Sequence, residues 1–210
     1  MLTIGICGAS GSGKSTLAAE LAARIHGSAI LLNQDAYYRD HPDLSFSERE
    51  KLNFDEPGIF EHDLLYQDIR SLMDGTPILR KAYDFSLHKR ADTDEIILPG
   101  DVLIFEGIHA FHDSRLRNLL DFRIFVQVDP DICLLRRVQR DILERNRSVE
   151  GVAAQYMKTV KPMYDRWIRN YIDYADLVVM GGGKNQRIVD ILAFYINHGM
   201  SAGEDEKAAE

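Results

Sequence analysis

The stretch Gly8-Ala9-Ser10-Gly11-Ser12-Gly13-Lys14-Ser15 decides the fold of this 210-residue chain. An apolar run over residues 2–7 precedes it, and an alanine- and leucine-rich run over 15–25, closed by Gly27, follows it. This order predicts a buried strand, a glycine-rich loop and a helix. The stretch also fits the pattern G-x-x-x-x-G-K-[ST], whose glycines let successive backbone N–H groups surround a phosphate at the helix N-terminus.

A nucleoside triphosphate is the ligand that this loop is expected to bind. Lys14 reaches the β- and γ-phosphates in such loops, and the Ser15 hydroxyl is a ligand of Mg²⁺. A flexible turn before a helix is the alternative, but at average composition the pattern occurs by chance in under about 1% of chains of this length. The flanking strand and helix make a chance match rarer still.

Four more apolar runs, at 29–32, 101–105, 123–128 and 177–180, resemble the first. They are continuous rather than alternating, which predicts strands of a parallel sheet that is covered on both faces. Helical patterns lie between and after them, at about 62–73, 113–120, 131–145, 149–168 and 186–197. We expect one α/β domain over residues 1–198, with a five-stranded parallel sheet and helices on both faces, as in P-loop NTPases and kinases.

Two stretches fall outside this alternation. The stretch from about 35 to 100 is less periodic and carries Pro42, Pro57, Pro77 and Pro99. It is too long for a plain connection, so we expect an insertion that handles the substrate. Residues 199–210 have no hydrophobic anchor and are expected to form a tail without fixed structure.

Composition excludes several classes of function. The 25 Lys and Arg against 33 Asp and Glu give a formal net charge of -8, which argues against a nucleic-acid binder. No apolar run reaches the roughly 20 residues that span a bilayer, and the first residues lack the basic region of a signal peptide. Cys7 and Cys133, the two cysteines, lie in apolar runs, so we expect a reducing, cytosolic setting without a disulfide framework.

Two carboxylates follow predicted strands and are expected at the sheet edge where the phosphate loop lies. Glu106 ends one strand as a single acid, where motor ATPases have Asp or Asp-Glu, and no guanine-reading Asn-Lys-x-Asp segment is present. We interpret Glu106 as part of the Mg²⁺ site, the alternative being a solvated acid at a strand end. Asp35 follows another strand, where a kinase needs a base for the attacking hydroxyl; an exposed loop acid is the alternative.

Two irregular segments, 53–57 and 81–90, mix aromatic and polar side chains. This composition suits an aromatic-walled site for a planar ligand, although a peripheral core with surface charges has the same composition. His88 alone would be interpreted as structural. His109 and His112 lie three residues apart, but no cysteine or further carboxylate pattern supports zinc, so we interpret both as structural.

The segment from 136 to 147 carries five arginines and no lysine. If the helix is continuous, Arg136, Arg137, Arg140 and Arg147 fall within an arc of about 100°. The planar guanidinium matches phosphate oxygens, so we interpret the segment as a lid that clamps the transferring phosphate. A surface helix with Asp141 and Glu144 as ion-pair partners is the alternative.

These residues resemble the uridine kinase (uridine–cytidine kinase) family from about residue 3 to 197. The ordered motifs are residues 8–16, Gln34-Asp35-x-x-Tyr38, Asn53-Phe54-Asp55-x-Pro57, Tyr83-Asp84-Phe85-x-x-His88, Phe105-Glu106-Gly107-Ile108, Arg137-x-x-Arg140-Asp141-x-x-x-Arg145-x-Arg147, Gln155-Tyr156 and Tyr174-Ala175-Asp176. The phosphate loop alone is generic. The arginine spacing followed by Gln155-Tyr156 is specific.

The resemblance implies a role for each matching residue. Asp35 is the base on the nucleoside 5′-hydroxyl, and Lys14, Arg140 and Arg145 complete the catalytic set. ATP is implied to bind Gly8, Ala9, Ser10, Gly11, Ser12, Gly13, Lys14, Ser15, Thr16 and Lys184, with Ser15 and Glu106 as metal ligands. The implied nucleoside contacts are Asp55, Arg137 and Gln155 on the ribose, Tyr83, His88 and Arg147 on the pyrimidine, and Phe54, Phe85 and Tyr38 as further substrate contacts.

Members of this family are cytosolic, depend on Mg²⁺ and on ATP (sometimes GTP), act in pyrimidine salvage and are commonly homotetramers. The resemblance therefore implies transfer of the γ-phosphoryl group of ATP to uridine or cytidine by a homo-oligomer. The chain departs from the family after the last strand, where residues 181–185 lack its proline and arginine, at Gly58, where an acid is usual, and at Asn146, where glycine is common.

Two alternatives stay open. A related P-loop kinase uses another acceptor, such as phosphoribulose, pantothenate or nicotinamide riboside. A nucleotide-binding regulator whose catalysis has decayed keeps the loop without the reaction.

Overall fold

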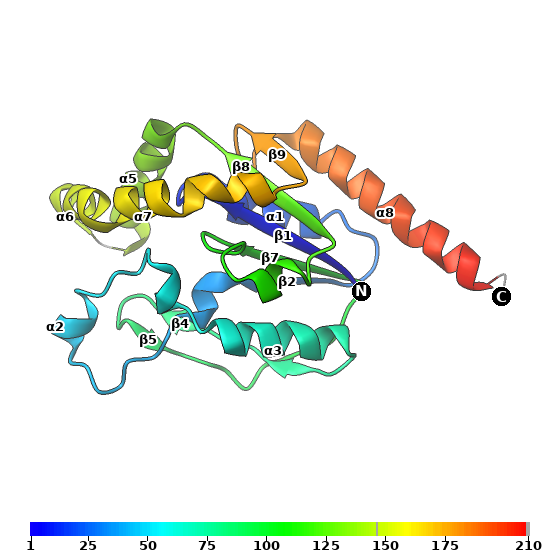
Figure 1. The fold of residues 1–210 in the computed structure, drawn as a ribbon, viewed down its shortest axis with the longest axis horizontal. Coiled ribbons are helices and arrows are strands. Elements are labelled where there is room, and N and C mark those ends of the chain that lie inside the picture. The colour runs from blue at the N-terminus through cyan, green and yellow to red at the C-terminus, as the bar shows by residue number, and fades with distance from the viewer. Residues whose placement is uncertain (146, 209–210) are drawn as a thin grey trace.

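Five strands form one parallel sheet at the centre of the molecule (Figure 1). The computed structural model describes residues 1–145 and 147–208, and for residues 200–208 the backbone alone. The strands are β1 (Leu2–Gly8), β2 (Ala29–Asn33), β7 (Val102–Gly107), β8 (Phe122–Gln127) and β9 (Leu177–Met180). Their order is β2-β7-β1-β8-β9, and every neighbouring pair is parallel. The predicted five-stranded parallel sheet is confirmed.

Helices cover both faces of the sheet, because each strand is apolar on both sides. On one face, α1 (Lys14–Ala22) and α8 (Gln186–Ala208) pack with Ile4, Ile6 and Ile104. On the other face, α3 (His62–Met73), α4 (Ser114–Arg117) and the 3₁₀ helix η4 (Ile168–Tyr174) pack with Phe105 and Phe125. Neighbouring residues of β7 thus belong to different cores, as the two-residue period of a strand requires.

The stretch 35–100 is built from short elements around α3. It holds η1 (Gln34–Tyr37), α2 (Phe46–Arg49), η2 (Pro57–Ile59), the antiparallel pair β3 (Ile78–Leu79) and β6 (Ile96–Ile97), and the hairpin of β4 (Tyr83–Asp84) and β5 (Lys89–Arg90). Figure 1 shows α2, β4 and β5 beside one another, beyond the end of α3. The less periodic composition therefore corresponds to a small layer added to the sheet domain.

The second half of the chain differs from the sequence prediction at three places. Arg147 does not lie on a continuous helix with the other arginines: α5 (Pro130–Arg145) ends before it, and the N–H of Arg147 donates to the carbonyl of Asp141. The helix expected over 149–168 is divided into α6 (Val149–Gln155), a π-helical turn η3 (Tyr156–Val160) and α7 (Lys161–Arg166). The helix expected over 113–120 is only the short α4.

The chain end also differs from the expectation of a tail after residue 198. The backbone of α8 continues to Ala208, and residues 209 and 210 lie outside the described residues, as does Asn146. Ala, Glu and Lys, which follow in this stretch, are strong helix formers, and no proline interrupts them. No helix in the described ranges is both long and apolar enough to cross a membrane.

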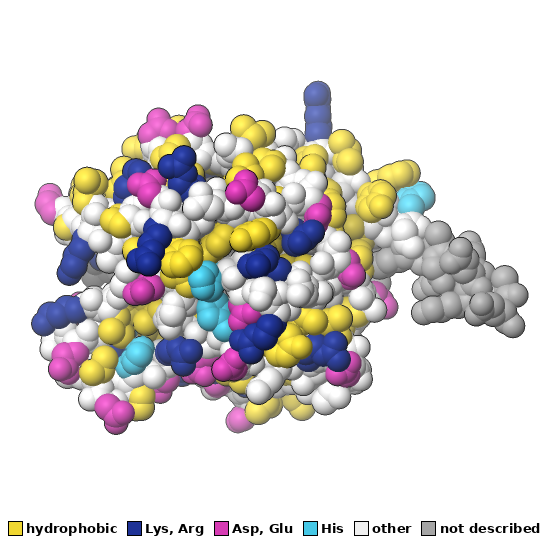
Figure 2. All heavy atoms as spheres, in the orientation of Figure 1, with side chains coloured by type: hydrophobic (Ala, Val, Ile, Leu, Met, Phe, Trp, Pro, Cys, Tyr) yellow, Lys and Arg dark blue, Asp and Glu magenta, His cyan; other side chains and the backbone are white. Residues whose placement is uncertain are grey.

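The edge formed by the carboxyl ends of the strands carries the predicted functional residues. Ile6 of β1 and Asn33 of β2 are both paired with Glu106 of β7, so the loops after all three strands start at one level. From β1 the chain runs to β2 and then β7 on one side of β1, and from β7 it crosses to β8 on the other side. Such a switch point is where open α/β sheets bind ligands. On the face shown in Figure 2, Lys and Arg side chains are interspersed with Asp and Glu rather than gathered into a basic stripe.

Candidate active site

The phosphate loop lies tightly against two other segments. Gly11 and Gly13 have φ angles of 83° and 91°, in the left-handed region that favours glycine. A Cβ on Gly11 would lie 2.3 Å from the carbonyl oxygen of Cys133, and one on Gly13 would lie 2.9 Å from the nitrogen of Gly183. The glycines are therefore required both by their backbone angles and by the close approach of α5 and of the loop after β9.

Ser15, Lys14 and Glu106 form the floor of the site. The Ser15 hydroxyl donates to Oε1 of Glu106 at 2.9 Å, which leaves its lone pairs free, and Lys14 Nζ lies 4.0 Å from Oε2. Glu106 is 2% exposed, and its Oε2 has no hydrogen-bond partner in the described structure. Burial raises the pKa of Glu106, and the nearby charge of Asp35 raises it further against the effect of Lys14.

An open cleft of about 300 Å³ lies above this floor. It is lined by Ser15, Asn33, Asp35, Ala36, Tyr83, Phe85, Arg140 and Arg145. These residues come from the phosphate loop, the end of β2, the β4–β5 hairpin and the end of α5. The structure thus brings the predicted base, two predicted arginines and two predicted aromatic residues to one space, large enough for a small ligand.

Asp35 is held at the start of η1, directly after β2. The side chain of Asn33 accepts from the N–H of Asp35 at 2.7 Å, which caps this turn. The carboxylate is half-buried, and the cleft reaches it. The cap therefore directs an ionisable oxygen toward the space beside the phosphate loop.

A buried carboxylate, Asp141, joins the arginines of the predicted lid. Arg140 donates to its Oδ1 through Nε at 2.9 Å and through Nη2 at 2.8 Å. Arg137, Arg145 and Arg147 lie 3.6, 3.7 and 3.8 Å from its carboxylate oxygens. Asp141 has no exposed surface. The surface ion-pair alternative is thus wrong for this residue, which is a central counter-charge for four guanidiniums.

The carboxylate of Asp55 is contacted by side chains from η3 and α5. It accepts from the Thr159 hydroxyl at 2.9 Å and lies 3.6 Å from Nη1 of Arg137. Arg137 also donates to the Ser10 hydroxyl at 3.0 Å and to Oε1 of Gln155 at 3.1 Å. Arg137 is buried and therefore connects three parts of the chain: the phosphate loop, the segment that carries Asp55, and α6.

Arg147 and Lys184, two further residues predicted to bind ligands, lie on different sides of the site. Arg147 donates to Oε1 of Gln155, the same oxygen that Arg137 contacts. Lys184 and Thr16 are exposed, on the loop after β9 and on the first turn of α1. The backbone of Gly183 lies against the phosphate loop, so Lys184 stands at the rim on the predicted ATP side.

Aromatic rings form a layered wall on the hairpin side. The ring of Phe54 stacks on His88 with centroids 4.8 Å apart, and Arg145 lies over the ring of Phe85 at 4.4 Å. Tyr38 is 5% exposed, stacks on Phe60 at 4.5 Å and lies behind Tyr83 at 4.9 Å. Tyr38 is therefore not one of the residues that line the cleft but supports those that do.

His88 is held in a costly conformation. Its φ angle is 50°, in the left-handed region, where a histidine is uncommon. Burial lowers the pKa of His88, and neighbouring arginines, led by Arg147, lower it further against the effect of Glu50. Its Nδ1 is buried without a hydrogen-bond partner in the described structure. A neutral ring held under strain with a free nitrogen is typical of a ligand contact.

We expect His88→Ala to raise the KM for the acceptor about tenfold, since the ring that stacks on Phe54 is lost together with the nitrogen that is free to bond a ligand. The KM for ATP should stay within about twofold, because His88 does not touch the phosphate loop. Initial rates with each substrate varied in turn measure both constants. His26→Ala, at an exposed position before β2, is the control. An equal effect on both substrates would place His88 outside the acceptor pocket.

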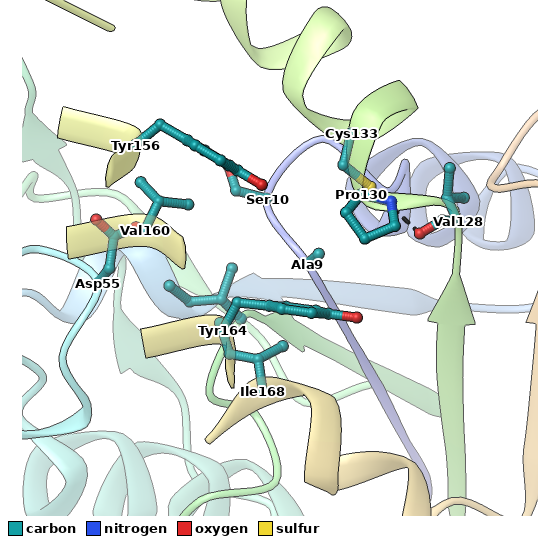
Figure 3. A pocket seen from close by; sticks show the side chains of 11 residues that line it. Ala9, Ser10, Asp55, Val128, Pro130, Cys133, Tyr156, Val160, Tyr164 and Ile168 are labelled. Carbon is teal, nitrogen blue, oxygen red and sulfur yellow. Dashed lines mark hydrogen bonds between the residues drawn. The ribbon is translucent and has the colours of Figure 1, made fainter. Parts of the chain in front are cut away.

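A second cavity, of about 30 Å³, lies behind the phosphate loop (Figure 3). Ala9 and Ser10 line it on one side, and Tyr156, Val160 and Tyr164 line it on the other. This volume holds about one water molecule and no nucleoside. The cavity therefore belongs to the packing between the loop and the helices that follow the lid, and the open cleft is the candidate site.

Sequence reasoning missed several residues that hold this site. Thr159 donates to Asp55 from the π-helical turn η3, and no sequence pattern predicts this turn. Arg49 of α2, 8% exposed, donates to the carbonyls of Leu44 and Leu87 and so braces the turn that carries His88. A buried arginine in a short polar helix gives no periodic signal. The spacing of the arginines and Asp141 in α5, in contrast, is visible in the sequence, although it does not show that Asp141 is buried.

The chain has relatives among known proteins. The family described as PRK, Phosphoribulokinase / Uridine kinase family, matches residues 3–187. A uridine kinase of Leuconostoc citreum (strain KM20) is 48% identical over 194 residues, which cover 91% of this chain and 92% of that protein. A uridine kinase of Ligilactobacillus salivarius (strain UCC118) is 44% identical over 190 residues, 90% of this chain and 89% of that protein.

The fold is shared more widely. The solved structure of phosphoribulokinase from Rhodobacter spheroides aligns with a TM-score of 0.63 at 17% identity, over 85% of this chain and 69% of that chain. At this identity the alignment shows a common fold, whereas the family match and the sequence relatives show the family. The chain is a kinase and belongs to the phosphoribulokinase / uridine kinase family.

Proposed function

We propose that this kinase transfers the γ-phosphoryl group of ATP to the 5′-hydroxyl of uridine or cytidine. The observation that carries the proposal is the single cleft that brings Ser15, Asp35 and Arg140 together with the aromatic residues Tyr83 and Phe85. The charged residues suit the phosphate and the hydroxyl, and the rings suit a planar base. Relatives named uridine kinase, at 44 and 48% identity, support the choice of acceptor.

The proposed reaction makes one bond and breaks one. The 5′-oxygen bonds to the γ-phosphorus, the bond from that phosphorus to the β–γ bridging oxygen breaks, and ADP leaves. Asp35 accepts the proton of the hydroxyl. Lys14, Arg140 and Arg145 compensate the charge of the transferring group, whose transition state is loose and depends chiefly on positioning and electrostatics. Burial lowers the pKa of Arg145, with Arg140 adding to the effect, so an incoming phosphate stabilises this crowded pair.

The residues present fit a magnesium ion. Ser15 keeps free lone pairs because its proton is donated to Glu106, and the second oxygen of Glu106 is buried without a hydrogen-bond partner in the described structure. Hard oxygen ligands of this kind suit Mg²⁺ bound together with phosphates. Ser15 and Glu106 would hold the ion, which neutralises part of the triphosphate charge when bound.

Ribose recognition is assigned to Asp55, Arg137 and Gln155. Asp55 is 5% exposed, and Arg137 is 6% exposed, so a sugar hydroxyl that meets them replaces little water. A site built to bind a hydroxyl rejects the analogue that lacks it, because its buried polar groups lose their partner. We therefore propose that the enzyme prefers ribonucleosides to 2′-deoxyribonucleosides.

We place the reaction in the cytosol, within pyrimidine salvage, and in a homo-oligomer. The free thiols of Cys7 and Cys133, both buried, fit a reducing compartment. Salvage follows from the acceptor, since a free nucleoside is the product of nucleotide breakdown. Assembly stays a prediction from the family resemblance, and sedimentation of the purified chain measures it.

An initial-rate survey tests the proposed function. Mg²⁺·ATP is offered with uridine, cytidine, their 2′-deoxy forms, ribulose 5-phosphate, pantothenate and nicotinamide riboside, and nucleotide products and ADP are both measured. We expect one ADP for each uridine or cytidine monophosphate formed. Turnover of only one of the other acceptors would assign a different kinase activity. Tight ATP binding without ADP from any acceptor would favour a regulator.

A further inference from the structure

A buried chain of hydrogen bonds, outside the cleft, connects the segments that carry Asp35 and Asp55. Its centre is His109, which follows β7 and has no exposed surface. The main-chain N–H of His109 donates to Oε1 of Gln34 at 2.8 Å. Its ring bonds through Nε2 to the carbonyl oxygen of Asp55 at 2.7 Å and through Nδ1 to the Tyr171 hydroxyl at 2.8 Å.

The partners fix where the protons lie. A carbonyl oxygen only accepts, so Nε2 of His109 carries the proton that it donates to Asp55. Nδ1 is then an acceptor and receives the proton of the Tyr171 hydroxyl. The Tyr171 oxygen in turn accepts from Nδ1 of His112, 3.0 Å away. One direction of donation, from His112 through Tyr171 and His109 to Asp55, satisfies the whole chain.

Burial keeps this direction constant. It lowers the pKa of His109 to about 3, and the neighbouring His112 and His62 act in the same sense against the bond to Asp55. Burial also raises the pKa of the Tyr171 hydroxyl. Both groups are therefore neutral over the working range of pH, so the ring of His109 stays a donor on one side and an acceptor on the other.

His109 is the residue at which the two acidic segments meet. Gln34 directly precedes Asp35. The side chain of Gln34 packs closely against Gly107, since a Cβ on Gly107 would lie 2.4 Å from the Cβ of Gln34. Asp55 has its N–H bound by Asn53 at 3.1 Å and its carbonyl bound by His109. The backbone N–H and the ring of one residue thus bind the segment of the proposed base and the segment of the proposed ribose contact.

We infer that His109 is a positioning residue that sets the spacing between Asp35 and Asp55, and thereby the discrimination between ribose and 2′-deoxyribose. The inference rests on the proposed function. A nucleoside must present its 5′-hydroxyl to Asp35 and its 2′- and 3′-hydroxyls to Asp55 together. When the segment that carries Asp55 is no longer bound at the Asp55 carbonyl, this match is lost. The loss is larger for a ribonucleoside, which uses both hydroxyls, than for a 2′-deoxyribonucleoside, which uses only the 3′-hydroxyl.

His109→Leu tests the inference, because leucine fills the space and removes both ring hydrogen bonds. We expect kcat/KM for uridine to fall about 20-fold and that for 2′-deoxyuridine to fall less than about threefold, with the KM for ATP within about twofold. His109→Gln retains an N–H for the Asp55 carbonyl and should recover part of the uridine preference. Tyr171→Phe removes only the hydroxyl and should shift the preference in the same direction by about threefold.

A matched control separates positioning from stability. Thr3→Val removes a buried hydroxyl that bonds to Asp121 at the amino end of β1, at the opposite edge of the sheet. A loss of folded enzyme lowers both nucleoside rates equally, so the control should leave the ratio of uridine to 2′-deoxyuridine unchanged, whatever its melting temperature. If His109→Leu does not fold, the glutamine and phenylalanine variants make the same comparison.

The outcomes are distinct. Absence of uridine turnover by the unmodified enzyme overturns the proposed function and this inference with it. Uridine turnover by the unmodified enzyme, together with an unchanged nucleoside ratio in the His109 and Tyr171 variants, overturns the inference alone. A ratio that falls in His109→Leu, recovers in His109→Gln and stays constant in Thr3→Val supports it.

Discussion

Asp35→Asn is expected to lower kcat by about 100-fold or more, with the KM for uridine and for ATP changed by less than about twofold. The substitution keeps the shape of the side chain and removes its capacity to accept a proton. The cap from Asn33 to the main chain of residue 35 does not involve the replaced group, so the turn after β2 is retained. Binding contacts survive, and the loss falls on the chemical step.

Initial rates and a separate measurement of ATP binding by calorimetry check this result. Asp43→Asn, an exposed acid in the same segment, is the control for a change of charge. A kcat for Asp35→Asn close to that of the unmodified enzyme would remove Asp35 as the base. A loss of ATP affinity would instead assign Asp35 a role in holding the metal and the triphosphate.

Asp141→Asn is expected to cost both stability and rate. Asparagine can still accept one hydrogen bond from Arg140, but four guanidiniums then lack their shared counter-charge and repel one another. Breaking a buried ion pair on one side costs about 3 kcal/mol of the free energy of unfolding. Displacement of Arg140 and Arg145, which are proposed to contact the transferring phosphate, should lower kcat about 100-fold.

Denaturant unfolding and initial rates measure the two effects separately. Glu144→Gln removes one negative charge from an exposed position of the same helix, α5, and should change neither quantity appreciably. A folded Asp141→Asn variant with nearly normal kcat would show that Arg140 and Arg145 keep their places without this carboxylate. Equal effects in the two variants would point to the net charge of the helix rather than to the buried cluster.

The sheet and its functional edge could be predicted because their signals are local. A strand, a glycine-rich loop and a helix follow one another around Lys14, and continuous apolar runs mark strands that are buried on both faces. Once the sheet is parallel, Asp35 and Glu106 must share an edge, since Glu106 lies at the carboxyl end of β7 and Asp35 follows the carboxyl end of β2. Convergence around the cleft then follows from topology.

What the sequence did not predict depends on contacts between distant residues. Thr159 reaches Asp55 across 104 positions, through a π-helical turn that has no sequence signature. His109 meets Tyr171 62 positions later, so the structural interpretation of the histidine pair could not include its partners. The burial of Asp141 arises from the residues packed around α5, and a single helical pattern does not show which polar face is covered.

The close contact between Gly11 and Cys133 couples the position of the phosphate loop to that of α5. The Cys133 carbonyl occupies the place of a Gly11 side chain, so the loop cannot move toward the first turn of α5 without displacing it. Arg140 and Arg145 lie on the same helix, about two and three turns beyond Cys133. A displacement of the phosphate loop would therefore be passed along α5 to the two arginines that are proposed to contact the transferring phosphate.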